Sequence, residues 1–327
     1  MTSEKVEVLT QIWQDVLQLD SVGPHDNFFD LGGDSALAIQ LFTRIASTCG
    51  QQLPPVMIYH VPTIAAQAEL LEQPSNPELS PLVLLKSGNL DHPPVFIAPG
   101  LGGGPAEFFQ LVEYIDAPHS IYGLQPRGIE GFDEPCASIE DMASFYLRGI
   151  LRLQPHGRYI LAGYSLGGLV ALEMAKMLRN AGNEIALLVM LDSYPDRNLL
   201  SKFQKLRLFA QKTKIRFANR GRIPRSSIRL GGLSSRDGIN VFAPAFERVR
   251  ESAFVALRSY TPAFYPGPVK FVRAAELTDF PKNPAAVWRG IISKIEVDTV
   301  PGDHVGMLTR EYANLGAVLT RYLRQAT

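Results

Sequence analysis

The sequence predicts two folded parts, a small all-α bundle and a larger α/β domain with a mostly parallel sheet. Over residues 1–72, apolar residues recur at helical spacing, beginning with Leu9, Ile12, Trp13, Val16 and Leu17. From residue 82 on, short β-rich apolar runs alternate with helical patterns, which is typical of a parallel sheet with helices on both faces. Between the parts, residues 73–81 are rich in Pro, Ser and Asn, which is typical of a semi-rigid linker.

The first part, over residues 1–72, is expected to be a bundle of about four helices. Its first helix leads into a loop over residues 24–30 and then into a second helix with apolar positions over 37–45. Asp34 or Ser35 can cap the second helix, because either side chain can accept a hydrogen bond from a free helical amide. The chain breaks at residues 50–55, and Pro62-Thr63 opens the last helix.

The larger domain, over residues 82–327, is expected to contain seven strands and several helices. A helix over 138–153 opens on Ser138-Ile-Glu-Asp141, which has the form of a capping box. Further helices are expected over 169–178 and 308–323. The predicted strands are 83–85, 95–98, 121–124, 159–162, 185–191, 269–273 and 295–300.

A G-x-S-x-G pattern, Gly163-Tyr-Ser165-Leu-Gly167, lies between the fourth strand and the helix that follows. In a strand–turn–helix context this pattern is the nucleophile elbow of α/β-hydrolases, whose tight turn lifts the serine hydroxyl clear of the sheet. A glycine-rich turn with an incidental serine is the alternative, and the pentapeptide alone leaves it open. The strand before and the helix after favour the elbow, so we predict an α/β-hydrolase domain.

A nucleophilic serine needs a base and an acid that orients the base, and the sequence offers both. Asp192 ends the strand 185–191, and His304 lies in the loop between the last strand and the last helix. The order Ser165, Asp192, His304 is that of α/β-hydrolases. Asp279 and Asp303 compete with Asp192; Asp303 is adjacent to the histidine, and neighbours rarely face each other in the required way. We predict Asp192.

An oxyanion hole needs two backbone amides. The elbow supplies the amide of Leu166. The glycine-rich loop after the strand 95–98 is expected to supply the second from Leu101, with Gly100 as the alternative. Such a loop could instead bind phosphate, but it lacks the G-x-x-x-x-G-K-[ST] pattern of nucleotide sites.

The run from Asp26 to Leu37 resembles the core motif of the carrier domains of nonribosomal peptide synthetases and polyketide synthases. The resemblance implies that Ser35 is the attachment point of 4′-phosphopantetheine, and that upstream synthetase modules and a phosphopantetheinyl transferase are partners. A helix N-terminus also favours the incoming phosphodiester. The alternative is that Ser35 is only a helix cap.

The second domain resembles the terminal thioesterases of the same synthases. The resemblance implies that an acyl or peptidyl thioester is released from the carrier, by serine acyl-enzyme formation and then hydrolysis or macrocyclisation. Rival interpretations are a C–C bond-forming cyclase of the Claisen or Dieckmann type, or a non-catalytic carrier or docking module. The matching runs are 121–128, 155–159, Gly163 to Gly168, Leu191-Asp192-Ser193 and Pro301-Gly-Asp-His304.

Asp192 and His304 are separated by more chain than one or two strand–helix units need, so we predict a helical lid over about residues 198–260. Residues 202–229 hold ten basic residues and no acidic ones, while residues 1–72 hold nine acidic residues and two basic ones. A solvated face and a nucleic-acid site are alternatives for the basic run. We favour docking of the basic lid on the acidic carrier.

Composition limits the remaining possibilities. The formal net charge is 0, and the two cysteines are too few for a disulfide framework or a zinc site. The N-terminus shows no basic segment followed by an apolar one, and no apolar run is of membrane-spanning length. We therefore expect a cytoplasmic protein without a metal, a nucleic-acid partner or a membrane partner.

Overall fold

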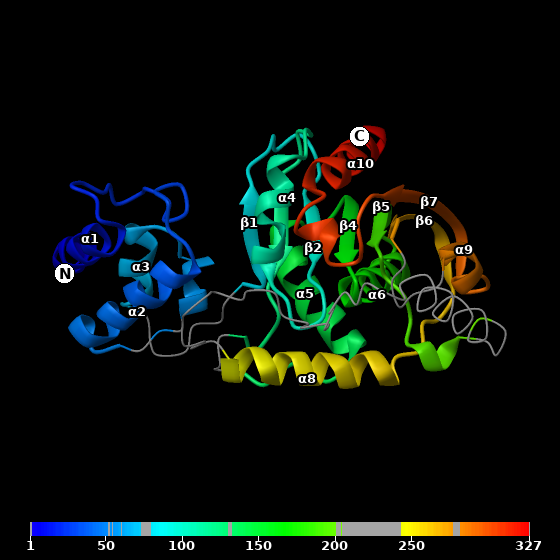
Figure 1. Ribbon diagram of the computed structural model, residues 1–327, viewed down its shortest axis with the longest axis horizontal. Coiled ribbons are helices and arrows are strands. Elements are labelled where there is room, and N and C mark those ends of the chain that lie inside the picture. Colours follow the sequence, from blue (N-terminus) through cyan, green and yellow to red (C-terminus); the bar gives the residue numbers. More distant parts are fainter. Residues whose placement is uncertain are drawn as a thin grey trace, which may run out of the picture. The chain divides into compact units, whose positions relative to one another are not determined.

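The structure is a computed structural model of the chain, shown in Figure 1. It describes residues 2–51, 53, 55–59, 61–72, 80–129, 133–200, 204, 243–276 and 282–326. The chain forms two compact units. The first contains Met1–Ser80, Arg127–Glu134 and Leu233–Arg248, and the second contains Pro81–Pro126, Pro135–Gly232 and Val249–Thr327. The domain boundaries at residues 72 and 82 stay a prediction.

The first unit is helical. Between residues 2 and 72, the described residues form three α-helices and one 3₁₀ turn, which agrees with a small bundle. The buried residues include Trp13, Phe28 and Phe42, and the indole of Trp13 donates a hydrogen bond of 3.0 Å to the buried Gln67 side chain. Trp13 and Phe42 occupy apolar positions of the predicted helices, whereas Phe28 belongs to the loop between them. The elements are α1 (Thr2–Leu17), α2 (Ser35–Cys49), η1 (Pro55–Tyr59) and α3 (Ile64–Leu70).

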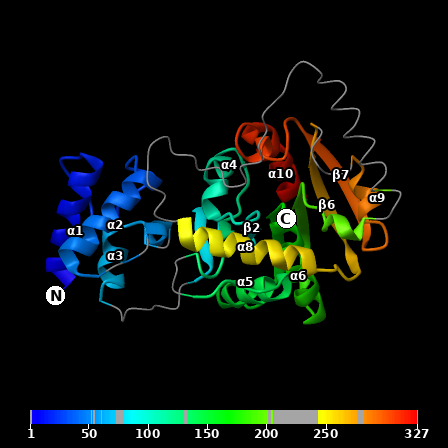
Figure 2. The ribbon, with the colours of Figure 1, turned by 60° about the horizontal axis from the view of Figure 1, so that its bottom comes forward.

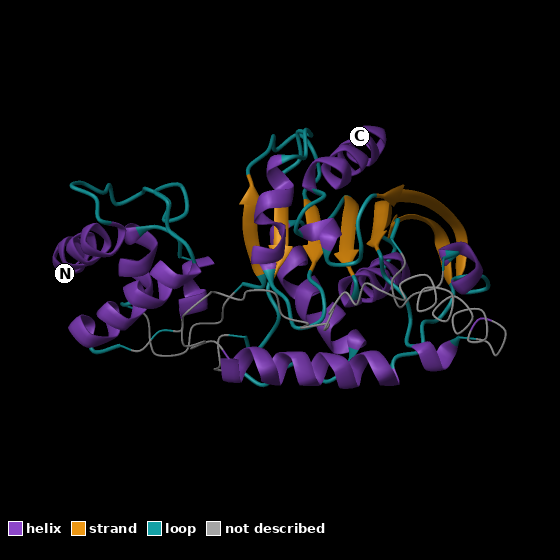
Figure 3. Cartoon of the chain, viewed as in Figure 1, coloured by secondary structure: helices purple, strands orange, loops and turns teal. Residues whose placement is uncertain are grey.

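One sheet of seven strands forms the centre of the second unit, in the order β1-β3-β2-β4-β5-β6-β7 (Figure 3). β1 pairs with β3 antiparallel, and the other neighbours are parallel. All seven predicted strands are confirmed, with small differences at their ends. They are β1 (Leu82–Lys86), β2 (Val95–Ala98), β3 (Ile121–Leu124), β4 (Arg158–Tyr164), β5 (Glu184–Leu191), β6 (Tyr265–Ala274) and β7 (Ile292–Val300).

Helices cover both faces of the sheet. In β4, Tyr159 and Leu161 join the core under α5 and α6, while Ile160 and Ala162 join the core under α4 and α10. The strand is therefore apolar on both sides, as central parallel strands are. Ser138 accepts the hydrogen bond of a capping box at the start of α5. The elements are η2 (Pro105–Phe108), α4 (Phe109–Glu113), α5 (Ile139–Leu153), α6 (Leu166–Asn180), α9 (Pro284–Val287) and α10 (Tyr312–Ala326).

The last helix begins later than the sequence predicts. Leu308 lies in the short 3₁₀ turn η4 (Gly306–Leu308), and α10 starts at Tyr312. The amides of Thr309, Arg310 and Glu311 all donate to the carbonyl of Gly306, which tightens the chain into a turn instead of a helix. The helix predicted over 308–323 therefore starts too early, because the helical spacing of apolar residues continues through this turn.

Between Asp192 and β6, the structure describes η3 (Arg197–Leu199) and the helix α8 (Ala243–Ser259). Ala253, Ala256 and Tyr260 are buried in the same core as α5 and α6, and Figure 2 shows α8 in yellow alongside these helices. A helix in the predicted insertion is thus present. The basic residues of the run 202–229 lie outside the described residues. None of the helices in the described part of the chain is long and apolar enough to cross a membrane.

Candidate active site

Ser165 stands alone in the turn between β4, which ends at Tyr164, and α6, which begins at Leu166. Its backbone has φ 53° and ψ −117°, a conformation that side-chain-bearing residues rarely adopt. The surrounding structure holds it there, and the Ser165 amide donates to the Leu191 carbonyl at 2.9 Å. This is the strained geometry expected of a nucleophile elbow.

Two glycines make this turn possible. A Cβ on Gly163 would lie 2.0 Å from the carbonyl oxygen of Gly167, and a Cβ on Gly167 would lie 2.2 Å from the carbonyl oxygen of Ala98. Both contacts are with backbone, which cannot move aside as a side chain can. The spacing of the motif therefore reflects the close approach of β4, α6 and the loop after β2.

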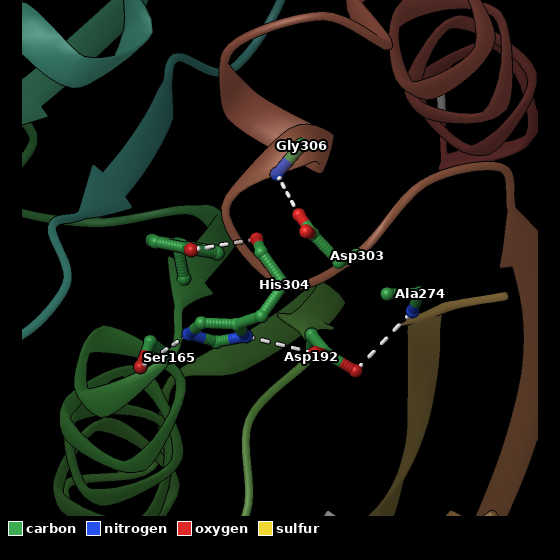
Figure 4. A network of polar contacts seen from close by, with 7 residues as sticks. Ser165, Asp192, Ala274, Asp303, His304 and Gly306 are labelled. Carbon is green, nitrogen blue, oxygen red and sulfur yellow. Dashed lines mark hydrogen bonds and ion pairs between the residues drawn. The ribbon is translucent and has the colours of Figure 1, made fainter. Parts of the chain in front are cut away.

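His304 lies between Ser165 and Asp192 (Figure 4). Its Nε2 is 3.1 Å from Ser165 Oγ, and its Nδ1 is 2.8 Å from Asp192 Oδ2. A carboxylate can only accept, so Nδ1 carries the hydrogen of the second bond and Nε2 presents its lone pair to the serine. The three predicted residues are therefore brought together in the order that general-base activation of a serine requires.

Asp192 is held firmly at the end of β5. It is 2% exposed, its amide donates to the Val272 carbonyl at 2.7 Å, and its Oδ1 accepts from the Ala274 amide at 3.2 Å. Asp303, one of the competing acids, faces the backbone of the η4 turn, where it accepts from the Gly306 amide at 2.6 Å. Asp279, the other competitor, lies outside the described residues.

The backbone amides predicted for the oxyanion hole differ in whether their hydrogens are available to a substrate oxygen. Leu166 is the first residue of α6, so its amide is one of the donors that a helix leaves free. Gly100 donates its amide hydrogen to Glu107 Oε2 at 3.0 Å. Because that hydrogen is engaged, the predicted second donor that we retain is Leu101.

Two residues near His304 were not singled out from the sequence. The ring of Tyr164 stacks on the imidazole at 4.8 Å between centroids, and its hydroxyl donates to the His304 carbonyl at 2.7 Å. Burial raises the pKa of this hydroxyl, so it stays protonated and able to donate. Glu107 is partly buried, and burial raises its pKa to about 7. Tyr164 could have been found from its place beside Ser165, whereas Glu107 carries no sequence signal.

In the helical unit, Ser35 is the first residue of α2, and Asp34 Oδ1 accepts from the Leu37 amide at 2.8 Å, so Asp34 is the cap. The preceding turn packs tightly, because a Cβ on Gly33 would lie 2.4 Å from the ring of Phe28. The start of α2 thus follows a turn in which Gly32 and Asp34 are exposed. This arrangement fits a phosphodiester, which helix N-terminal amides favour.

The fold and the Ser–His–Asp arrangement define a serine hydrolase of the α/β-hydrolase type. Residues 93–325 match the thioesterase domain model, and residues 7–71 match the model of the phosphopantetheine attachment site. The chain belongs to the thioesterase domain family, and it carries a phosphopantetheine attachment domain ahead of the thioesterase.

Similar proteins are large synthetases. The chain is 42% identical over 193 residues to a dimodular nonribosomal peptide synthase of Bacillus subtilis, a match that covers 59% of this chain and 8% of that protein. It is also 34% identical to malpibaldin synthetase of Mortierella alpina, in a match that covers 100% of this chain and 6% of that protein. A four-domain nonribosomal peptide synthetase structure covers 98% of this chain and 26% of its own, with a TM-score of 0.59 and 22% identity. The matched region thus covers less than a tenth of each of these two curated synthetases.

Proposed function

We propose that this chain releases an acyl or peptidyl chain from a phosphopantetheine thioester on its own carrier domain, by way of an acyl-enzyme on Ser165. The observation that carries the proposal is the Ser165–His304–Asp192 arrangement on a strained elbow, with separations of 3.1 and 2.8 Å. Upstream synthetase modules that supply the chain and a phosphopantetheinyl transferase that modifies Ser35 are the partners we propose with it.

The chemistry follows from the hydrogen bonds. His304 Nε2 takes the proton of Ser165 Oγ as the oxygen attacks the thioester carbonyl carbon. Buried Asp192 stabilises the imidazolium that forms and keeps its ring in place. The imidazolium then gives the proton to the departing sulfur, which leaves as a thiol. Water or a nucleophile within the acyl chain attacks the acyl-enzyme, again with His304 as the base.

Negative charge develops on the carbonyl oxygen during both attacks. The amides of Leu166 and Leu101 are the donors we assign to it, one from the α6 N-terminus and one from the loop after β2. The partial positive charge at the start of α6 adds to this stabilisation.

Phosphopantetheine, when bound, supplies the flexible arm and the thiol that carries the acyl group. Ser35 would hold it through its hydroxyl oxygen, and the α2 amides would face its phosphodiester. Gly32 and Asp34 beside it are exposed, which leaves the serine's neighbourhood accessible to a modifying enzyme.

Loading and release can be followed in one experiment by intact mass spectrometry. With a phosphopantetheinyl transferase and an acyl-coenzyme A, the chain is expected to gain one acyl-phosphopantetheine group. The acyl mass should then disappear while the phosphopantetheine mass remains. Ser35→Ala should prevent loading altogether, because the attachment oxygen is missing.

Ser47, an exposed serine of α2, provides the matched control, and Ser47→Ala should load and release normally. Loading that survives in Ser35→Ala would disprove the assignment of the attachment site. A loaded wild type that keeps its acyl group, with no acyl-enzyme detected, would disprove the proposed release.

We also propose that charge attraction brings the carrier to the hydrolase domain. The supporting observation is the balance of −7 over residues 1–72, against ten basic residues over 202–229. Release from the loaded chain is expected to slow as salt rises, because the screening length falls from about 10 Å at 0.1 M to about 3 Å at 1 M. Cleavage of a small uncharged thioester should respond little.

Replacing Lys202, Lys205, Arg207, Lys212 and Lys214 by glutamine should reproduce the high-salt rate at low salt. The test compares the two substrates in the same protein, since salt could also affect the site itself. If both substrates respond alike, or if the neutralised variant releases its carrier-bound chain at the wild-type rate, the basic run is a solvated face.

A further inference from the structure

We propose that Glu107 is a positioning residue, which shapes the oxyanion loop of residues 99–104 through the hydrogen bond that its carboxylate accepts from the Gly100 amide. The inference rests on the proposed function, because it assigns a role within the same reaction. It adds a residue outside the Ser165, His304 and Asp192 group.

The loop folds around the Glu107 side chain. Oε2 accepts from the Gly100 amide at 3.0 Å, on one side of the loop. On the other side, a Cβ on Gly103 would lie 2.0 Å from Oε1, so the Gly103 backbone lies directly against the carboxylate. The Gly103 amide in turn donates to the Gly100 carbonyl at 3.1 Å. Leu101, the donor assigned to the oxyanion, is thus held between two residues that both contact Glu107.

The same loop is in contact with the catalytic base through Tyr164. A Cβ on Gly100 would lie 3.0 Å from Cδ1 of Tyr164, and the same ring stacks on the His304 imidazole. A shift of the loop would therefore release one wall of the site as well as the oxyanion donor. Misplacement of reacting groups by about 1 Å can cost roughly 100-fold in rate.

Glu107 also acts on the site through its charge, because it interacts electrostatically with His304. Its pKa is raised to about 7 by burial, while the Gly100 amide and the positive charge of His304 oppose the rise. The titratable groups that face it are His304 from the loop after β7 and the neutral phenol of Tyr164 from β4, and Arg250 of α8 packs against Gly102 in the same loop. An ionised Glu107 presents a negative charge to His304 and also accepts the Gly100 hydrogen bond. Glutamine removes the charge and keeps an acceptor, so the two effects can be separated by mutation.

The stability of the protein should carry the signature of this carboxyl group. The raised pKa means that the folded state holds the proton more tightly than the unfolded state between pH 4.5 and about 7. The contribution of Glu107 is therefore most favourable below pH 4.5 and is lost as the pH rises through 7. The free energy of unfolding of the wild type relative to Glu107→Gln should fall over this range and be constant above it.

The test compares Glu107→Leu, Glu107→Gln and the control Glu113→Leu, an exposed glutamate at the end of α4. Two rates are measured on the full chain: turnover of a small thioester, and reaction of Ser165 with a fluorophosphonate, whose adduct places an oxygen in the oxyanion hole. Glu107→Leu is expected to lose about 10- to 100-fold in kcat and in labelling rate, with KM changed little.

Glu107→Gln keeps an acceptor for the Gly100 amide and should recover most of both rates, while its kcat profile should lack any change that the ionisation of Glu107 near pH 7 causes in the wild type. Glu113→Leu should match the wild type. Should Glu107→Leu fail to fold, Glu107→Asp takes its place, since the shorter side chain cannot reach Gly100.

Wild-type kcat in Glu107→Leu or Glu107→Asp would overturn the proposal, and so would a glutamine variant as impaired as the leucine variant. Failure of the proposed function looks different. In that case wild-type Ser165 reacts with the fluorophosphonate but no thioester is cleaved, and the labelling rates of the variants still decide the role of Glu107.

Discussion

Ser165→Ala is expected to abolish release of the carrier-bound chain, with a loss of about 10⁶-fold in kcat. Alanine removes the attacking oxygen and leaves His304 Nε2, now 3.1 Å from an empty position, with nothing to deprotonate. The fold should survive, because serine and alanine bear the same strain at φ 53°. Intact mass spectrometry of the loaded chain measures the loss, since the acyl group should persist on the carrier.

Ser193 offers a matched control in the same site. It is buried beside Asp192, and a Cβ on Gly168 would lie 2.4 Å from its Oγ, so its hydroxyl packs against the elbow helix. Ser193→Ala should still form an acyl-enzyme, because this hydroxyl does not contact His304 Nε2. Release that persists in Ser165→Ala and disappears in Ser193→Ala would show that the wrong serine has been assigned.

Asp192→Asn is expected to lower kcat by about 10⁴-fold with the structure intact. The reason lies in the two bonds of the carboxylate. Oδ1 accepts from the Ala274 amide, so an asparagine would place its oxygen there and turn its NH₂ group toward His304 Nδ1. The imidazole would then carry its hydrogen on Nε2, where it cannot accept the proton of Ser165.

The competing acids provide the comparison for this variant. Asp303→Asn should have a small effect, because an amide oxygen can still accept from the Gly306 amide. The steady-state kcat of the three asparagine variants at positions 192, 279 and 303 decides between them. If the Asp279 variant is the most impaired, Asp192 is not the residue that orients His304.

Much of the fold could be predicted because its signals are local. The short apolar runs of the strands, the capping box at Ser138 and the elbow glycines each depend on residues close together in the chain. Backbone conformation over such short stretches is governed by steric limits and by nearby hydrogen bonds. The last helix shows where this reasoning fails: the apolar spacing continues through Leu308, while the Gly306 carbonyl collects three amides and turns the chain.

The sequence by itself determined the seven strands, the position of Ser165 and the candidates for its partners. Only the tertiary structure showed which candidate faces His304, that the Gly100 amide is engaged, and that Glu107 and Tyr164 belong to the site. The physical reason is that side-chain contacts between residues 112 positions apart, such as Asp192 and His304, depend on the order and register of the strands. Parallel strands bring their carboxyl ends to one edge of the sheet, but the rotamers and loop turns there are set by packing between distant segments.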